Sequence, residues 1–466
     1  MMGLLRLKLR PFLTFFLIAL ANFAGAQSIE VGPKDALVIG VAMVSDGNVQ
    51  GAIAIADALI ERDSGDFSAL LLRTDAALVA QQNGDAIAFG ARAFAAARTD
   101  GQRTQSACLV AFAHTRLENF TRAQLWLRRA AQYAPDDAAK AVVAWDFRTV
   151  RERNPWSSSL RFGIFPRSNI NNGSTAEIYY LPGLDFPLTL QPSSRALSRF
   201  EISGGFSSQY RLHLDDVSAT FLTATGSFID YRLSNISAAL VPDIDGSDYA
   251  TSALDFGITH RRILADGFGP TTFTLKFGRN WSGKALALSD TYLTTQYIDA
   301  RIAQSVPLGD RDTLSFSAAR QRAEEFDDDS RRFDFKTTLR ASWVHVRDNQ
   351  DRFTFGVTGT RKTSAVADSD YTSLKYRIGY DFAEPILNTR FGISADYEER
   401  SFDESIYVAG PRNDTNVGVT LSMQFPELAF YWFEPVVNLE ARRNRSNPDL
   451  FDRDYQSIGF DLRSSF

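Results

Sequence analysis

The sequence predicts a multidomain protein, with N-terminal all-α tetratricopeptide-like helical repeats followed by an antiparallel transmembrane β-barrel of about 14 strands. Three observations support this fold class. The hydrophobic period changes from a helical one to a period of two near Asn154. A short Ala-rich motif in the helical half recurs with a period of about 34 residues. The second half contains a series of amphipathic segments, most of them long enough to be tilted membrane-crossing strands.

Length and composition limit the classes of protein. The chain has 466 residues, too many for one ordinary compact core, and its 44% hydrophobic content excludes a disordered chain. Beyond position 26 there is no run of eighteen consecutive apolar residues, which excludes a helical membrane protein. The 50 basic and 55 acidic residues give a net charge of −5, so nothing favours nucleic acid as a partner.

The segment 1–26 has the pattern of an export signal. Arg6, Lys8 and Arg10 precede an apolar run over 11–23, and the small residues Ala24 and Ala26 form the expected cleavage site. A transmembrane anchor, the alternative, requires a longer apolar run. The only cysteine is Cys108, so we expect neither a disulfide framework nor an N-terminal lipid. The expected domains are a signal peptide (1–26), a periplasmic helical domain (27–153) and a barrel domain (154–466).

The helical half contains the internal repeat. The sequence Ala-Ile-Ala-Ile at 52–55 recurs as Ala-Ile-Ala-Phe at 86–89. A third unit follows, with small or apolar residues at Ala123, Leu127 and Ala130 and Pro135 at its end. Stacked helical hairpins of this kind usually present a concave surface to a peptide or protein. A helical domain that only packs on its neighbour remains the alternative.

The second half alternates apolar and polar residues. Val417, Val419 and Leu421, for example, alternate with small or polar residues. The strands predicted in this way span 158–164, 200–212, 219–231, 249–262, 271–281, 292–306, 313–322, 332–346, 352–363, 371–382, 390–400, 415–425, 433–442 and 456–466. Long odd-numbered connections between these strands mostly alternate with short even-numbered ones. An outer-membrane barrel has such long outer loops and short periplasmic turns, and its even strand number leaves both termini in the periplasm.

The last strand supports the same location. Its apolar face carries Ile458, Phe460 and Leu462 and ends at the terminal Phe466. A C-terminal aromatic residue on an amphipathic strand is similar to the signal read by the barrel assembly machinery. We therefore expect the outer membrane of a Gram-negative bacterium as the location, with outer-membrane lipids and the assembly machinery as partners.

A segment after the first strand carries a family resemblance. Pro166, Ser168, Asn169, Asn171 and Asn172 resemble the Pro-x-Ser-Asn-x-Asn-Asn segment of the surface lipoprotein assembly modulator (Slam) family. The sequence Arg-Asn-Arg-Ser-Asn at 443–447 and the strand closing at Phe466 look like that family's final loop and strand, whereas Arg167 departs from the expected acidic or small residue. The resemblance implies a periplasmic tetratricopeptide domain, a fourteen-strand barrel, and delivery of lipoproteins or secreted proteins to the cell surface.

The same Asn-rich segment has a structural interpretation. Asn and Ser side chains hydrogen-bond nearby backbone and tolerate turn conformations, so the segment fits a turn at a strand end as well as a cargo contact. An acidic run at 324–329 and another at 243–248 fit solvated loops, with divalent-ion bridging to lipopolysaccharide as the alternative for the first.

No catalytic constellation is recognisable in the sequence. The histidines, His114, His213, His260 and His345, lack metal-ligand spacing, and there is no nucleophile elbow or phosphate-binding loop. We expect no enzyme activity, no metal and no cofactor. Two function classes remain: an export device that captures a lipoprotein or secreted protein through its helical domain, and a general porin or solute channel with a helical tether.

Overall fold

The computed structural model describes residues 30–283, 294–327, 330–430 and 433–464. Its contacts divide the chain into two compact units, one ending at Val143 and the other beginning at Ala144, so the division falls within a helix. Ala24 and Ala26 of the predicted signal cleavage site, together with Phe466, lie outside the described residues.

The first unit is built from antiparallel helical hairpins. The described helices are α2 (Pro33–Ser45), α3 (Val49–Arg62), α4 (Phe67–Val79), α5 (Asn83–Ala96), α6 (Asp100–Arg116), α7 (Phe120–Gln132) and α8 (Asp137–Arg153), the last of which extends into the second unit. Side chains at several N-termini satisfy free backbone N–H groups. Asp66 accepts hydrogen bonds from the N–H groups of Ser68 and Ala69, and Thr99 forms a capping box with Gln102.

The repeat seen in the sequence lies on the second helix of successive hairpins. Ala52 of α3, Ala86 of α5 and Ala123 of α7 are all fully buried. A small side chain at these positions allows neighbouring helices to approach closely. The interval from the start of α5 to the start of α7 is longer than the interval from α3 to α5, so the third hairpin departs from a strict period.

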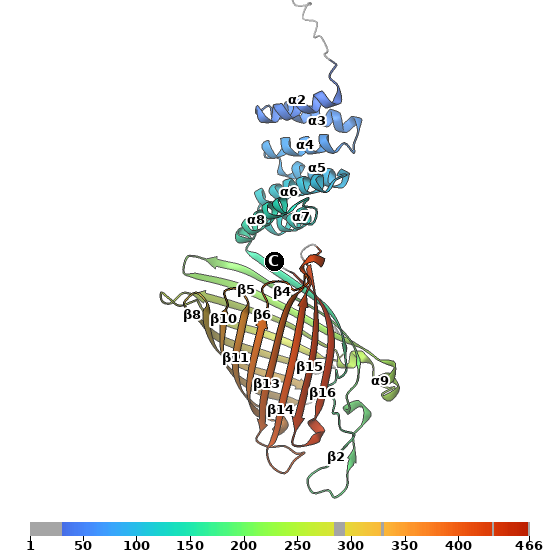
Figure 1. Cartoon of the computed structure of the whole chain (residues 1–466), viewed down its shortest axis with the longest axis vertical. Coiled ribbons are helices and arrows are strands. Elements are labelled where there is room, and N and C mark those ends of the chain that lie inside the picture. Colours follow the sequence, from blue (N-terminus) through green and yellow to red (C-terminus); the bar gives the residue numbers. More distant parts are fainter. Residues whose placement is uncertain (1–29, 284–293, 328–329, 431–432, 465–466) are drawn as a thin grey trace, which may run out of the picture. The chain divides into compact units, whose positions relative to one another are not determined.

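The second unit contains a closed antiparallel barrel of fourteen strands, which confirms the fold class (Figure 1). The barrel strands are β1 (Trp156–Arg167), β4 (Arg199–Leu214), β5 (Ser218–Leu233), β6 (Thr251–Arg262), β7 (Thr271–Ser282), β8 (Thr294–Leu308), β9 (Asp312–Asp327), β10 (Ser330–Val346), β11 (Arg352–Thr363), β12 (Tyr371–Asp381), β13 (Arg390–Phe402), β14 (Arg412–Gln424), β15 (Phe433–Ser446) and β16 (Arg453–Ser464). Each strand pairs with its neighbours in the chain, and β16 pairs with β1 to close the barrel.

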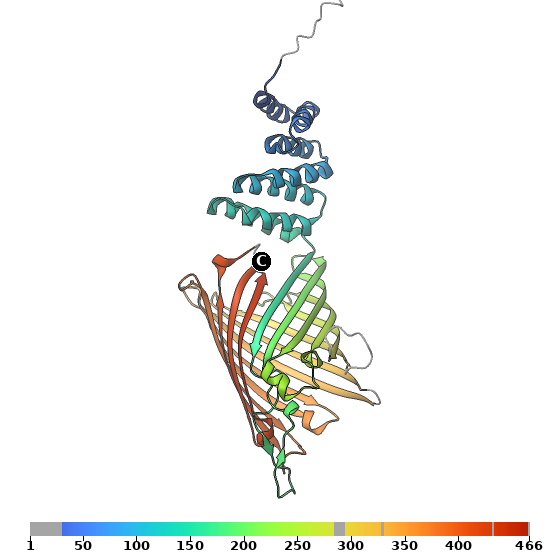
Figure 2. The same ribbon diagram turned by 90° about the vertical axis from the view of Figure 1, so that its right-hand side faces the viewer.

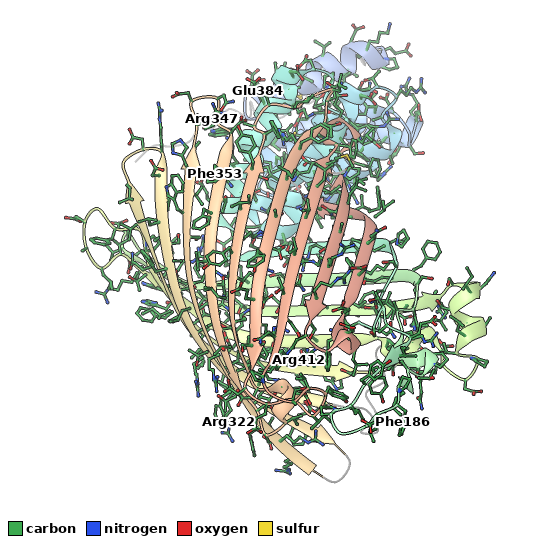
Figure 3. All side chains as sticks on the ribbon, turned by 60° about the horizontal axis from the view of Figure 1, so that its bottom comes forward. Phe186, Arg322, Arg347, Phe353, Glu384 and Arg412 are labelled. Atoms are coloured by element: carbon green, nitrogen blue, oxygen red, sulfur yellow. The ribbon has the colours of Figure 1, made fainter. Side chains whose placement is uncertain are left out.

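The two ends of the barrel differ. We call the end where β1 begins and β16 ends the near rim, and the opposite end the far rim. At the far rim, the connection from β1 to β4 contains the two-stranded sheet of β2 (Ile178–Tyr179) and β3 (Leu188–Thr189), which projects beyond the barrel strands in two views (Figures 1 and 2). The next far-rim connection contains helix α9 (Asn235–Leu240). Figure 3 labels Arg347 and Glu384 at the near rim and Arg322 and Arg412 at the far rim.

The observed strands correct several predicted boundaries. The first strand is not short: it covers Trp156–Arg167, because polar Ser157–Ser159 and Pro166 belong to the ladder although they obscure the alternation. At the far rim the strands run further than the alternation indicates, since β9 and β10 leave only 328–329 between them, and β15 and β16 leave only 447–452. The predicted alternation of long and short connections therefore holds only for the first three hairpins. The first part of the acidic run is also not a loop, because Glu324 and Glu325 are paired in β9.

Candidate functional site

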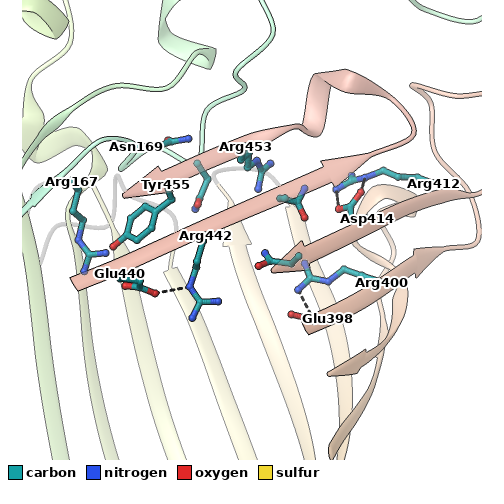
Figure 4. A pocket seen from close by; sticks show the side chains of 13 residues that line it. Arg167, Asn169, Glu398, Arg400, Arg412, Asp414, Glu440, Arg442, Arg453 and Tyr455 are labelled. Carbon is teal, nitrogen blue, oxygen red and sulfur yellow. Dashed lines mark hydrogen bonds and ion pairs between the residues drawn. The ribbon is translucent and has the colours of Figure 1, made fainter. Parts of the chain in front are cut away.

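A polar cavity of about 300 Å³ lies against the inner wall at the far rim (Figure 4). We call its lining residues the far-rim cluster. They come from β1, β13, β14, β15, β16 and the segment that follows β1: Arg167, Asn169, Asn172, Glu398, Arg400, Arg412, Asp414, Asn416, Glu440, Arg442, Asn444, Arg453 and Tyr455.

The strand register brings these residues to one face. Glu398 of β13 is opposite Asn416 of β14, Asn416 is opposite Asn444 of β15, and Asn444 is opposite Arg453 of β16. Side chains two positions along each strand share the face, which places Arg442 and Tyr455 beside this row. The alternation that sends apolar residues outward therefore collects the charged residues inside.

Most of the cluster's charges are paired along the wall. Arg412 donates to both carboxylate oxygens of Asp414, from Nε at 2.9 Å and from Nη2 at 2.6 Å, and both side chains are nearly fully buried. Arg400 lies 3.1 Å from Glu398. Such charge-assisted pairs fix the orientation of each guanidinium plane.

A second group of ion pairs crosses a strand. Arg442 of β15 lies 2.6 Å from Glu440 and 3.0 Å from Asp396 of β13, which also accepts Lys375 of β12 at 3.0 Å. The intervening strand β14 contributes Gly418, where a Cβ atom would lie 3.1 Å from both Arg442 and Asp396. The missing side chain therefore leaves room for the Arg442–Asp396 bridge.

The cluster carries more positive than negative charge. Its lining includes five arginines and three carboxylates. Among the described residues, Arg453 makes no ion pair, and its buried Nε and the Tyr455 hydroxyl lack hydrogen-bond partners. The arrangement is suited to binding a carboxylate or phosphate, or a polar chain that carries one, because guanidinium groups match the geometry of these anions.

The Asn-rich segment borders this cluster and is held by its own side chains. Asn169 exchanges two hydrogen bonds with the backbone of Gly173, at 2.8 and 2.9 Å. Asn171 donates to the carbonyls of Ser193 and Arg195 at 2.8 and 2.7 Å and accepts from the N–H of Leu197 at 3.0 Å. These contacts join the beginning and the end of the long far-rim segment.

Another residue of the Asn-rich segment, Ser168, links this segment to the last strand. Ser168 donates its N–H to the carbonyl of Gln456 at 3.0 Å and accepts from the N–H of Gln456 through its hydroxyl at 2.8 Å. Pro166 lies in β1 on the outward face, and Asn172 has a left-handed backbone with φ 49°. Asn169 and Asn172 line the cavity, so the segment both forms the turn that follows β1 and contributes to the wall of the cavity.

The residues of the C-terminal strand lie on the outer surface. Ile458 and Phe460 are 59% and 46% exposed, and Phe460 and Leu462 are paired with Ile164 and Phe162 of β1. Their face is continuous with the apolar outer face of the first strand.

Sequence reasoning missed the charged members of the far-rim cluster. Their signal is visible in retrospect as charged residues two positions apart near strand ends, as in Glu398 with Arg400 and Arg412 with Asp414. Within a single strand, such pairs are typical of solvent-exposed positions. Only the register between neighbouring strands shows that these charged side chains lie next to one another in the cluster.

The described part of the chain contains no group of three or more His, Cys, Asp or Glu residues placed to hold a metal ion. His213 contacts Asp215 at 2.8 Å, and His345 contacts Asp312 at 2.9 Å, each as an isolated pair. Within the same residues, no helix has both the length and the apolar character needed to cross a membrane.

No known family profile matches the chain, and no curated protein sequence does so. Structures with a related arrangement include OccAB3 of Acinetobacter baumannii, at 9% identity and a TM-score of 0.34, with 66% of this chain and 98% of that chain covered. They also include a FadL homologue of Pseudomonas aeruginosa, at 12% identity and a TM-score of 0.34, with 67% of this chain and 91% of that chain covered. OpdQ of P. aeruginosa matches at 12% identity and a TM-score of 0.31, with 66% and 97% covered. Likeness at this level does not transfer a function to this chain.

Proposed function

We propose that the chain is an outer-membrane transport barrel that helps deliver lipoproteins or secreted proteins from the periplasm to the cell surface of a Gram-negative bacterium. The membrane assignment is supported by the outer face of the barrel. Exposed apolar side chains occupy outward positions around the barrel, including Phe162 on β1, Phe277 on β7, Ile378 on β12 and Phe460 on β16. A closed barrel satisfies its backbone groups internally and tolerates lipid on such a face.

The proposal of export rests on one observation, a helical-hairpin array encoded in the same chain as the barrel. Passive diffusion through a pore requires no such array, whereas stacked helical hairpins present the kind of concave surface that binds a polypeptide. In our proposal the array is tetratricopeptide-like and periplasmic, because both ends of an even-stranded outer-membrane barrel face the periplasm.

The helical unit also carries side chains of the kind that bind proteins. Three arginines stack on aromatic rings: Arg116 over Phe112 at 4.7 Å, Arg129 over Trp126 at 4.4 Å, and Arg103 over Tyr133 at 5.2 Å. Aromatic residues and arginine dominate the binding energy of many protein interfaces. We propose these pairs as part of the cargo-capture surface.

A solute channel is the second candidate, favoured by the excess of arginine in the far-rim cluster. Deletion of residues 36–153 distinguishes the two functions. Export predicts a folded barrel, reduced protease accessibility of a neighbouring lipoprotein on intact cells, and unchanged uptake of a small hydrophilic solute. Normal display of all surface proteins, with no second gene supplying the domain, would contradict export.

A full-length variant tests the capture surface without removing a domain. We expect Phe112→Ser to reduce cargo display, since its ring is 49% exposed and its removal costs little folding stability. Val41→Ser is the matched control, because Val41 is similarly exposed, at 53%, and lies on α2, away from the Arg116–Phe112 pair. Equal display in the two variants would show that Phe112 is not part of the surface.

A further inference from the structure

The outward face of β7 to β10 near the far rim differs from the rest of the barrel's exterior. Asp255, Gly278 and Tyr297 share the inner face, because a Cβ atom on Gly278 would meet both of the other side chains. Their neighbours along each strand therefore point outward. These neighbours form two adjacent rows across the sheet: Leu254, Arg279, Gln296, Glu324 and Phe333, then Phe256, Phe277, Ile298, Arg322 and Phe335.

Four arginines gather on this face, and each stacks on an aromatic ring. Arg279 lies over Trp281 at 5.4 Å, and Arg322 over Phe333 at 4.8 Å. Arg320 over Phe335 and Arg331 over Phe326 complete the set, at 5.2 and 5.5 Å. Stacking holds a guanidinium by its face and leaves N–H groups at its edge to bind an anion.

The negative charge on this face is much smaller. Glu324 is the carboxylate within the two rows, and it lies 3.6 Å from Arg331. The buried Nε of Arg279 has no hydrogen-bond partner among the described residues. On the outer face of β15 and β16, by contrast, the arginines are paired: Arg443 and Arg445 lie 3.1 Å from Asp454, and Arg445 also approaches Asp452. Counted over the described residues alone, the β7–β10 face therefore keeps uncompensated positive charge.

A groove of about 430 Å³ joins the charged and apolar parts of this face. Arg279, Trp281 and Arg322 line one part of it, and Phe256, Phe277 and Ile298 line another. The next outward row, farther from the far rim, carries Ile258, Leu275 and Ala300 beside Arg320, and the row after it carries Phe273, Ile302, Ala318 and Leu339. The surface is thus cationic near the rim and apolar towards the middle of the barrel.

We propose that this face binds a phosphorylated lipid of the outer leaflet, with phosphate at Arg279 and Arg322 and acyl chains along Phe256, Phe277 and Ile298. The proposal rests on the membrane-spanning role proposed above and does not depend on a protein cargo. An arginine facing lipid is costly unless an anion accompanies it, and guanidinium–phosphate pairs are strong and often bidentate. The arginines and the adjoining apolar groove together therefore favour a phosphate carried by a lipid over a free anion.

The test uses the full-length protein in nanodiscs of phosphatidylcholine doped with bisphosphorylated lipid A. Bound lipid is then counted by native mass spectrometry after transfer to detergent. We expect the wild type to retain lipid A and the double variant Arg279→Gln/Arg322→Gln to retain at least tenfold less. Arg443→Gln, the matched control at a compensated arginine, retains the wild-type amount. Millimolar inorganic phosphate does not displace the lipid, whereas dephosphorylated lipid A is not retained.

Three results would overturn the proposal: no lipid A on the wild type, equal retention by the double variant, or equal loss in Arg443→Gln. If inorganic phosphate alone displaces lipid A, the face is a binding site for a free anion and not for a lipid. Each sample is checked for heat-modifiable gel mobility, which reports a folded barrel. A folded barrel without bound lipid refutes only the lipid site, whereas a soluble protein without heat modifiability refutes the membrane role as well.

Discussion

Replacing Asn171 with Ala should open the far-rim segment while the barrel stays closed. The Asn171 side chain makes three hydrogen bonds to backbone groups of Ser193, Arg195 and Leu197, at 2.8, 2.7 and 3.0 Å. Each such bond contributes about 1 kcal/mol, so their loss costs about 3 kcal/mol, or roughly a 100-fold change in the opening equilibrium. Barrel closure depends on strand pairing and is expected to persist.

Limited trypsin digestion of the purified protein in detergent measures this opening at the Arg195–Ala196 bond. The cleavage rate follows the open population when closing is fast, so we expect the Asn171→Ala rate to rise roughly 100-fold. Asn172→Gly is the control, because glycine adopts the left-handed backbone at φ 49° and the Asn172 side chain makes no hydrogen bond with described residues. A rate for Asn171→Ala within twofold of wild type would show that the Asn171 hydrogen bonds do not hold the far-rim segment closed. If the rate does rise, measuring cargo display in the same variant separates a structural role of the Asn-rich segment from a functional one.

Three further predictions concern the two units. Unboiled and boiled samples should migrate differently in gels, because a closed barrel resists detergent until heated; identical mobility together with recovery in the soluble fraction would contradict the membrane assignment. Phe466→Asp should lower the amount of assembled barrel, measured as the heat-modifiable band in membranes, whereas normal levels would show that the terminal residue is not a sorting signal. Burial, reinforced by Arg122, lowers the pKa of His114, so the unfolded state binds more protons below about pH 6.5 and the helical unit loses stability as the pH falls. The Tm of the helical circular dichroism signal should therefore drop from pH 7.5 to 5.5, and His114→Gln should reduce that drop; an equal drop in both proteins would exclude His114 as the cause.

The fold could be predicted because its signals are local. A period of two identifies a strand that has one apolar face, and that periodicity located all fourteen barrel strands. Strand ends were less predictable. At the far rim, strands such as β9 continue past the apolar band into charged residues, and there hydrogen bonding to the neighbouring strand maintains the extended backbone. The alternation carries no information about such polar extensions.

The far-rim cluster could not be predicted, because it depends on contacts between distant strands. Asp396 and Arg442 are far apart in the sequence, and their bridge requires both the register of three strands and the absence of a side chain at Gly418. The Asn-rich segment was recognisable by composition, but its partners at 193–197 were not. Composition indicated that the segment could form a turn, whereas only the fold shows which backbone groups it binds.

The inner wall also bears on how a cargo would pass. Arg442 and Lys375 both pair with Asp396 along the wall, so these charges are already satisfied before any cargo arrives. A passing polypeptide would then gain little by binding them, and weak binding favours release over retention. Arg453, which makes no ion pair with described residues, is the exception and lies at the far rim. In the proposed orientation this rim faces the cell exterior, so the strongest anion-binding position of the cluster would be met at the end of the path, where it would favour exit of an acidic segment over its return.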